Sequence, residues 1–362
     1  MPSAKPALVV QSEQPFNGGP RVEALCREFV TPSELFFVRN HGPVPEIDRD
    51  SYRLAVSGMV AHPLRLSLVD LRTRFPRVRL QAALQCAGNR RREFMTIAPI
   101  PGEIPWGPEA IGNAEWSGWR LRDVLQAADL QAGAAHVVFT GLDRLERGGQ
   151  TSGFGGSIPL DKAASPEVLV ADEMNGVPLS AIHGFPLRVV VPGYIGARSV
   201  KWLGEISLQA HPSENYYQAH AYKIFSPHVR AETADWTRGL MLGELPVNAV
   251  ICDPADGTVL HDRTIRLRGY AITGGGRRIE RVDLTADGGR TWQQADLSAG
   301  NDPWTWTLFE ARLSLTPGDY EICARARDSA AEMQPEDART IWNFKGYVNN
   351  AWHRIRVRMT AD

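Results

Sequence analysis

The chain has no apolar run long enough to cross a bilayer, and it has almost no net charge. A transmembrane helix needs about 20 consecutive apolar residues, and no such stretch occurs in the 362 residues. Forty basic side chains stand against 41 acidic ones, which leaves a net charge of −1. The overall charge therefore predicts neither a nucleic-acid partner nor an anionic membrane, and any positive field must be local.

Targeting signals are also missing from the sequence. Residues 1–10 contain one lysine, two prolines and no apolar core, which fits neither a Sec nor a twin-arginine signal. The last residues do not form the peroxisomal Ser-Lys-Leu signal. We expect a cytoplasmic protein, although an export signal already removed would leave the same sequence.

Cysteine is scarce, with four residues in the chain. Cys26, Cys252 and Cys323 lie in apolar or mixed surroundings and never form a Cys-x-x-Cys pair. This spacing argues against a zinc site or a thioredoxin-type motif. We expect all three to be buried structural residues.

The fourth cysteine, Cys86, lies in a different setting. An Ala-Gly-Asn turn and three arginines at 90–92 follow it, and such a field favours the thiolate. A thiolate is a nucleophile or a soft metal ligand, and arginine forks bind oxyanions. The segment suggests redox chemistry on a small anion. By itself it also fits a buried cysteine beside a solvated arginine face, since only five of the forty basic residues are lysines.

Six segments carry a resemblance to a known family. They read Phe-Phe-Val-Arg-Asn-His at 36–41, Cys-Ala-Gly-Asn-Arg-Arg at 86–91, His-Gly-Phe-Pro-Leu-Arg-Val-Val-Val-Pro-Gly at 183–193, Gly-Ala-Arg-Ser-Val-Lys-Trp-Leu-Gly at 196–204, Tyr-Lys-Ile-Phe-Ser-Pro at 222–227 and Ile-Trp-Asn-Phe-Lys-Gly at 341–346. In residues and order they resemble the molybdenum-cofactor enzymes of the sulfite oxidase family. The match runs from about residue 30 to the C-terminus, and several motifs in order are more specific than one.

The resemblance implies a molybdenum ion carried by one pterin dithiolene, with Cys86 as the only protein ligand to the metal. The implied catalytic residues are Arg39, Arg91, Tyr222, Lys345 and Trp106. The implied cofactor-binding residues are Phe37, Asn40, His41, Cys86, His183, Arg188, Arg198, Ser199 and Lys201. His183, Arg188, Arg198 and Lys201 would meet at the cofactor's phosphate, although without the resemblance they would be taken as scattered surface charges.

Lys345 departs from the family pattern. Many members have arginine at this position, in an Asn-Leu-Arg-Gly segment, whereas this chain has Asn-Phe-Lys-Gly at 343–346. Lysine keeps the charge but lacks the bidentate fork. We therefore expect weaker substrate binding than an arginine would give.

The resemblance also implies an α+β fold of two domains. A sulfite-oxidase-type molybdopterin-binding domain would span residues 1–240, with an irregular arm over 1–30. An all-β, immunoglobulin-like sandwich over 241–362 would follow and form a homodimer contact, with residues 331–350 returning to the first domain. Local patterns predict helices over 67–75 and 119–130, a hairpin at Asn175-Gly176, a buried strand at 189–191, and sandwich strands at 264–270, 279–284, 304–313, 318–326 and 353–358.

The activity implied is oxidation of sulfite, or a similar small oxyanion, to sulfate. The oxygen would come from water, and two electrons would pass to an external acceptor such as a cytochrome or oxygen. With 362 residues and no haem-binding module, the chain would be the haem-free form found in bacteria and plants. The alternatives are a nitrate or sulfoxide reductase of the same fold and a molybdopterin-binding homologue without activity.

Overall fold

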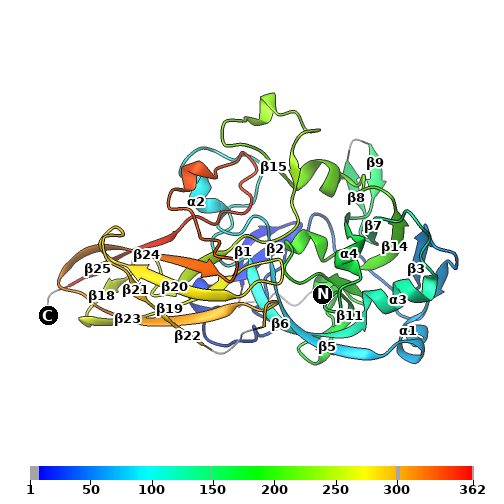
Figure 1. The fold of residues 1–362 in the computed structure, drawn as a ribbon, viewed down its shortest axis with the longest axis horizontal. Helices are drawn as coiled ribbons and strands as arrows, with labels where there is room; N and C mark the ends of the chain where they lie inside the picture. The colour runs from blue at the N-terminus through cyan, green and yellow to red at the C-terminus, as the bar shows by residue number, and fades with distance from the viewer. Residues whose placement is uncertain (1–7, 148, 299–301, 361–362) are drawn as a thin grey trace.

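The computed structural model describes residues 8–147, 149–298 and 302–360, which form two β-rich regions side by side (Figure 1). Helices are few and short in these ranges. The α-helices are α1 (Leu68–Arg74), α2 (Arg91–Met95), α3 (Leu121–Ala128) and α4 (Leu160–Ala163). Single turns of 3₁₀ or π-helix lie at Val22–Ala24, Ala181–His183, Gly196–Arg198, Tyr217–Ala221, Ala231–Thr233 and Ala338–Thr340. The fold is mostly β, so the expected α+β class overstates the helices.

The first region is built on two five-stranded sheets. One has the order β10 (Gly155–Pro159), β7 (His136–Gly141), β14 (Leu203–Gln209), β3 (Leu54–Gly58), β4 (Leu64–Leu66). The other has the order β12 (Val177–Pro178), β11 (Leu169–Met174), β6 (Ile111–Arg120), β5 (Arg77–Gln85), and β13 (Arg188–Val190) also pairs with β11. Both sheets share one apolar core with α1 and α3. Each large side chain buried there contributes roughly 1.5–3 kcal/mol.

Several local predictions for this region are confirmed. Ser67 and Asp70 form the expected capping box at the start of α1, and α3 lies within the predicted 119–130 range. Asn175, with φ of 53°, and Gly176 make the turn between β11 and β12. These features depend on residues within one turn of each other, which is why the sequence predicts them.

The prediction of an irregular N-terminal arm was wrong for residues 8–20. β1 (Leu8–Glu13) pairs antiparallel with β2 (Phe16–Pro20), so residues 8–20 form a hairpin, while 1–7 lie outside the described residues. Gly18 N donates to Val38 O (3.1 Å), and Val38 N donates back to Gly18 O (2.8 Å). The hairpin thus pairs with residues next to Arg39. Its second strand reads Phe-Asn-Gly-Gly-Pro, which has no strand-like alternation.

Two further sheets pack around a separate apolar core in the second region. The first has the order β17 (Asn248–Asp253), β19 (Thr264–Ile272), β23 (Thr307–Ser314), β22 (Asp296–Leu297). The second has the order β18 (Val259–Leu260), β25 (His353–Met359), β24 (Gly318–Asp328), β20 (Ile279–Thr285), β21 (Gln293–Gln294). The five predicted strands correspond to β19, β20, β23, β24 and β25. Cys26, Cys252 and Cys323 are buried free thiols, as expected.

Residues 331–350 return to the first region, as expected. Val348 N donates to Ala87 O (2.7 Å), and Trp342 Nε1 donates to Phe94 O (3.2 Å). Two small hairpins complete the described strands: β8 (Leu145–Arg147) with β9 (Gln150–Ser152), and β15 (Lys223–Ile224) with β16 (Leu240–Met241). No helix among the described residues is both long and apolar enough to cross a membrane.

Candidate active site

Cys86 follows the last residue of β5. Its amide donates to Ala110 O (2.9 Å), and its carbonyl accepts from Asn89 N (3.0 Å). Gly88 N lies 3.4 Å from Sγ and donates to it. The side chain is buried but lines a cavity. The strand end therefore fixes the sulfur while leaving one side of it open to a ligand.

The three arginines after Cys86 point to different places. Arg90 has φ of 64° and is fully buried, and its guanidinium donates to Glu93, to Asn248 Oδ1 (2.7 Å) and to Ala351 O (2.8 Å). Arg91 is buried beside the Cys86 turn, whereas Arg92 is exposed. Arg90 therefore joins the two regions, and Arg91 is the arginine whose side chain packs against the Cys86 turn.

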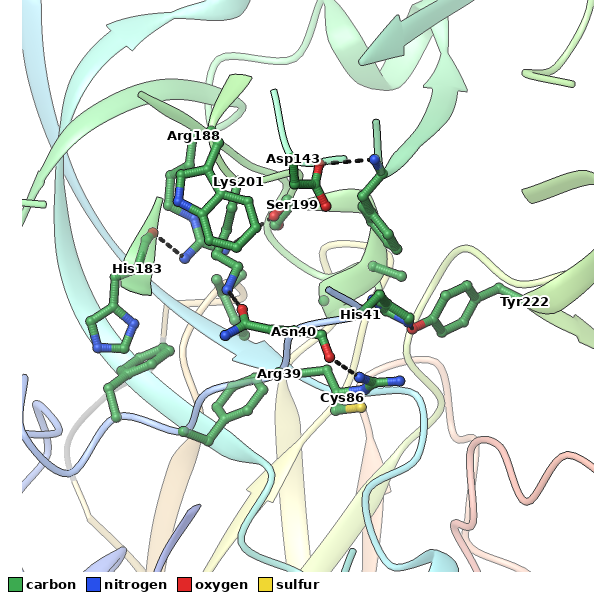
Figure 2. A pocket seen from close by; sticks show the side chains of 17 residues that line it. Arg39, Asn40, His41, Cys86, Asp143, His183, Arg188, Ser199, Lys201 and Tyr222 are labelled. Atoms are coloured by element: carbon green, nitrogen blue, oxygen red, sulfur yellow. Dashed lines mark hydrogen bonds between the residues drawn. The ribbon is translucent and has the colours of Figure 1, made fainter. Parts of the chain in front are cut away.

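Ten of the predicted site residues, Cys86 among them, line one cavity, and Figure 2 shows how they lie. They are Phe37, Arg39, Asn40, His41, Cys86, His183, Arg188, Ser199, Lys201 and Tyr222. Cys86 and Arg39 lie at one end, and His183, Arg188 and Lys201 lie at the other (Figure 2). Arg91, Trp106, Arg198 and Lys345 do not line this cavity.

Arg39 is positioned by its neighbours in the chain and by the N-terminal hairpin. Its Nη1 donates to Asn40 O and to Asn17 Oδ1 (3.2 Å). Asn17 Oδ1 also accepts from Asn40 N (2.8 Å), and Asn17 is 1% exposed. One buried amide thus orients two adjacent site residues. Asn17 lies outside every motif, so sequence reasoning did not identify it.

Tyr222 and His41 form a hydrogen-bonded pair on one wall of the cavity. The hydroxyl of Tyr222 lies 3.0 Å from His41 Nε2. Burial, opposed by Arg39, raises the pKa of Tyr222, and burial together with Arg39 lowers the pKa of His41 well below its usual value. At neutral pH the phenol is protonated and the imidazole is neutral, so a proton can be shared between Oη and Nε2.

The far end of the cavity is basic and tightly bonded. Arg188 donates to His183 O (3.1 Å) and Ser199 O (3.1 Å), and burial lowers its pKa to about 9. Lys201 Nζ donates to Asn40 Oδ1 and to Ile182 O (3.0 Å). Arg188 begins β13 and Lys201 lies two residues before β14; Val189 N donates to Val200 O (2.8 Å), so the two cations lie on paired segments.

Two residues change the predicted list. Asp143 lines the cavity, accepts from Phe154 N (2.9 Å) and has a pKa raised by burial. Sequence reasoning missed it because one aspartate in a loop carries no motif. Arg198, predicted as a cofactor ligand, lies behind the lining and donates to Leu242 O through Nε (3.2 Å) and Nη2 (2.7 Å).

The remaining predicted residues lie next to the cavity. Trp106 is fully buried in an apolar cluster that also contains Phe37 and Cys86, and its indole N–H has no hydrogen-bond partner among the described residues. Arg91 Nε donates to Lys345 O (3.0 Å), and Arg91 Nη1 donates to Ile104 O (2.8 Å). Lys345 Nζ donates to Glu103, a residue that no motif included.

The residues present fit a metal carried by a phosphate-bearing organic group. Cys86 offers one thiolate, and the described residues contain no cluster of three or more His, Cys, Asp or Glu side chains that would bind a metal by themselves. A metal at Cys86 therefore takes its other donors from a second molecule. Arg198 Nη1 is buried without a partner in the described structure, which leaves a donor for such a group.

Comparison with known proteins defines the class. Residues 41–217 match the family model "Oxidoreductase molybdopterin binding domain", and residues 240–360 match "Mo-co oxidoreductase dimerisation domain". The chain is 44% identical to sulfite oxidase of Gallus gallus over 98% of this chain and 78% of that protein. It is 40% identical to sulfite oxidase of Arabidopsis thaliana over 99% and 95%. The crystal structure of the sulfane dehydrogenase SoxCD from Paracoccus pantotrophus has a TM-score of 0.82 and 26% identity, covering 96% and 85%.

Fold, cavity and comparisons together define a molybdenum oxidoreductase whose cofactor is molybdenum-molybdopterin. The predicted cofactor class is confirmed. The chain belongs to the sulfite oxidase family.

Proposed function

We propose that the protein oxidises sulfite to sulfate and passes two electrons to an external acceptor. The supporting observation is that Cys86, Arg39 and Tyr222 line one cavity, with Arg91 packed against the Cys86 turn. A lone thiolate ligand, a cation for an oxyanion and a proton-holding phenol are what this reaction needs. The sulfite oxidases of Gallus gallus and Arabidopsis thaliana support the substrate.

Each residue then has a defined role. The bound cofactor supplies a metal that accepts two electrons together and releases them one at a time. Cys86 would hold that metal as a thiolate, and Arg39 and Arg91 would hold the anion, with Lys345 beside Arg91 and Trp106 packed behind the cavity lining. Tyr222 Oη holds a proton and exchanges it with His41 Nε2 (3.0 Å) as the charge at the site changes.

The basic end would bind the pterin and its phosphate. Arg188, Lys201 and His183 supply positive or polar edges, and Ser199, Asn40 and Phe37 line the path toward Cys86. Asp143 adds an acceptor for pterin N–H groups. Arg198 lies behind the lining on the Tyr222 side, where its Nη1 has no partner among the described residues and could serve the same bound group.

The second region would form a homodimer contact, which the dimerisation-domain match supports. The boundary between the two domains lies near residue 240 in this proposal, and the second domain is an immunoglobulin-like sandwich. The protein would act in the cytoplasm. Its electron acceptor would be a cytochrome or oxygen. Light scattering at micromolar concentration tests the dimer, and cell fractionation tests the location. Turnover with cytochrome c compared with turnover under air distinguishes the acceptors.

The decisive experiment is sulfite-dependent ferricyanide reduction by the purified, molybdenum-loaded protein, with Cys86→Ser as the control. We expect turnover that is lost in the variant while pterin stays bound. Full cofactor occupancy with no sulfite turnover would contradict the proposal. Activity with nitrate or a sulfoxide and a reduced dye would then indicate a reductase, and no turnover with any of them a carrier.

A further inference from the structure

A carboxylate lies between two cations beside the active-site turn. Glu103 Oε1 accepts from Lys345 Nζ, and Glu103 Oε2 lies 3.5 Å from Arg91 Nη2. Glu103 belongs to the loop between α2 and β6. Its two oxygens face the two side chains that the proposed function assigns to anion binding, in the way that two oxygens of a bound oxyanion would.

The neighbouring contacts leave Arg91 with Glu103 as its acidic partner. Nε and Nη1 donate to the carbonyls of Lys345 and Ile104, and the guanidinium lies 5.2 Å from the ring centre of Tyr347. Nη2 faces Glu103. An incoming anion therefore binds Arg91 through Nη2, the nitrogen that also faces Glu103.

Exposure gives the direction of approach. The Arg91 side chain is 3% exposed, whereas those of Glu103 and Lys345 are 15% and 20% exposed. The Glu103–Lys345 ion pair thus lies on the solvent side of Arg91. Glu103 and Arg91 also shift the pKa of Tyr222 in opposite directions, so both act on the region around that hydroxyl.

We propose that Glu103 sets anion selectivity by competing with the substrate for Arg91 and Lys345, so that an oxyanion binds only by displacing this carboxylate. The inference rests on the proposed function. Glu103 offsets one unit of the positive charge that Arg91 and Lys345 bring to the site, and the resulting loss of attraction is larger for a dianion such as sulfate than for a monoanion. It also weakens retention of the product, because a competing carboxylate is ready to replace sulfate when it leaves.

Glu103→Gln tests the proposal because it removes the charge and nearly preserves the shape. We expect the dissociation constant of sulfate to fall roughly tenfold and that of nitrate about threefold, since the electrostatic energy scales with ligand charge. The KM for sulfite should fall in parallel with the dissociation constant of sulfate. The measurement is calorimetric titration of the molybdenum-loaded protein with sodium sulfate and sodium nitrate at constant ionic strength.

Glu167→Gln is the matched control, because Glu167 forms a similarly buried ion pair with Lys162 (2.5 Å) away from the cavity lining. It should leave both affinities unchanged. Glu103→Ala should reproduce the preference for sulfate over nitrate if the Gln variant does not fold. Equal sulfate affinity in wild type and variant, or equal gains for sulfate and nitrate, would overturn the proposal.

The two proposals fail in different ways. If wild type does not oxidise sulfite, the proposed function fails, but the sulfate and nitrate titrations still test Glu103. If wild type oxidises sulfite and the Glu103 variants bind both anions as wild type does, the function stands and the role of Glu103 is rejected.

Discussion

At the scale of single residues, the site depends on positions that hold the functional groups in place without touching the substrate themselves. Asn17 fixes Arg39 and the amide of Asn40. Gly88 leaves room for Arg91, because a Cβ at position 88 would lie 2.6 Å from Arg91 Nη2. We therefore expect substitutions at both positions to change the kinetic constants for sulfite without removing a catalytic group.

Asn17→Ala removes the shared acceptor and should loosen Arg39. A hydrogen bond to a charged group contributes about 1.5–3 kcal/mol, so we expect the KM for sulfite to rise roughly tenfold or more with a smaller effect on kcat. Steady-state ferricyanide kinetics measures both constants. Ser12→Ala, which removes a different side-chain hydrogen bond of the same hairpin (Ser12 Oγ to Pro15 O, 2.9 Å), is the control and should leave KM unchanged; an unchanged KM in Asn17→Ala would show that the shared acceptor does not hold Arg39.

Gly88→Ala places a methyl group against the Arg91 guanidinium. Since real contacts at 2.6 Å do not occur, Arg91 must move, and we expect kcat/KM for sulfite to fall roughly 100-fold, as a displacement of about 1 Å can cause. Molybdenum content should stay at the wild-type level, which metal analysis checks. Unchanged kinetics would mean that Arg91 does not act on the substrate.

The residues found by sequence reasoning are those whose chemistry is tied to a contiguous motif. Cys86, Arg39 and Lys201 lie in such segments, and the structure brings all three to one cavity. Asn17 and Asp143 were missed because each is a single polar residue, placed at the site by chain segments distant in sequence. Only tertiary structure reveals them.

At the scale of elements, predictions were confirmed where an element depends on neighbouring residues, and they failed where a strand depends on pairing with another segment of the chain. The α1 capping box and the Asn175 turn depend on neighbouring residues, whereas β2 becomes a strand because β1 and Val38 lie beside it. β17 was not predicted either, and one of its contacts is with a buried side chain of β25. Ile251 N donates to His353 Nδ1 (3.2 Å).

The contact between β17 and β25 should make stability depend on pH. Burial and the charge of Arg90 lower the pKa of His353 from 6.5 to about 4. Between these two values the unfolded chain binds the proton and the folded chain does not, so stability is present above pH 6.5 and is lost as the pH falls toward 4. We expect this residue to account for a loss of about 2 kcal/mol between pH 7 and pH 5.

His353→Asn isolates that contribution, because the amide oxygen can still accept from Ile251 N and does not titrate. Urea unfolding followed at pH 7 and pH 5 should show a smaller loss in the variant. The loss will not vanish, since the lowered pKa of His41 acts in the same direction. An identical pH dependence in wild type and variant would rule out His353 as a contributor.

At the scale of the whole molecule, the two regions are joined by buried polar contacts as well as apolar packing. Arg90 connects the active-site turn to Asn248 and Ala351, while Asn349 Nδ2 donates to Arg90 O (3.1 Å). The sequence predicted two regions and a returning segment. It did not predict that an arginine of the active-site motif would be the link.

Arg90→Lys should destabilise the whole protein. One ammonium cannot replace a fork that serves Glu93, Asn248 and Ala351 at once, so we expect a loss of about 2–4 kcal/mol and a Tm lower by about 3–5 °C. Differential scanning calorimetry measures the change. The adjacent, exposed Arg92→Lys is the control and should leave Tm within about 1 °C; an equal shift in both variants would refute the linking role of Arg90.

The return of residues 345–351 to the Cys86 turn limits how such a protein can be recombined. Ala87, Arg90 and Arg91 each bond to this late segment, so the C-terminal region helps to position the Cys86 turn. A chimera that takes this region from a relative therefore also replaces contacts that hold the Cys86 turn. The two regions have separate apolar cores, but one cannot be exchanged without changing contacts of the other.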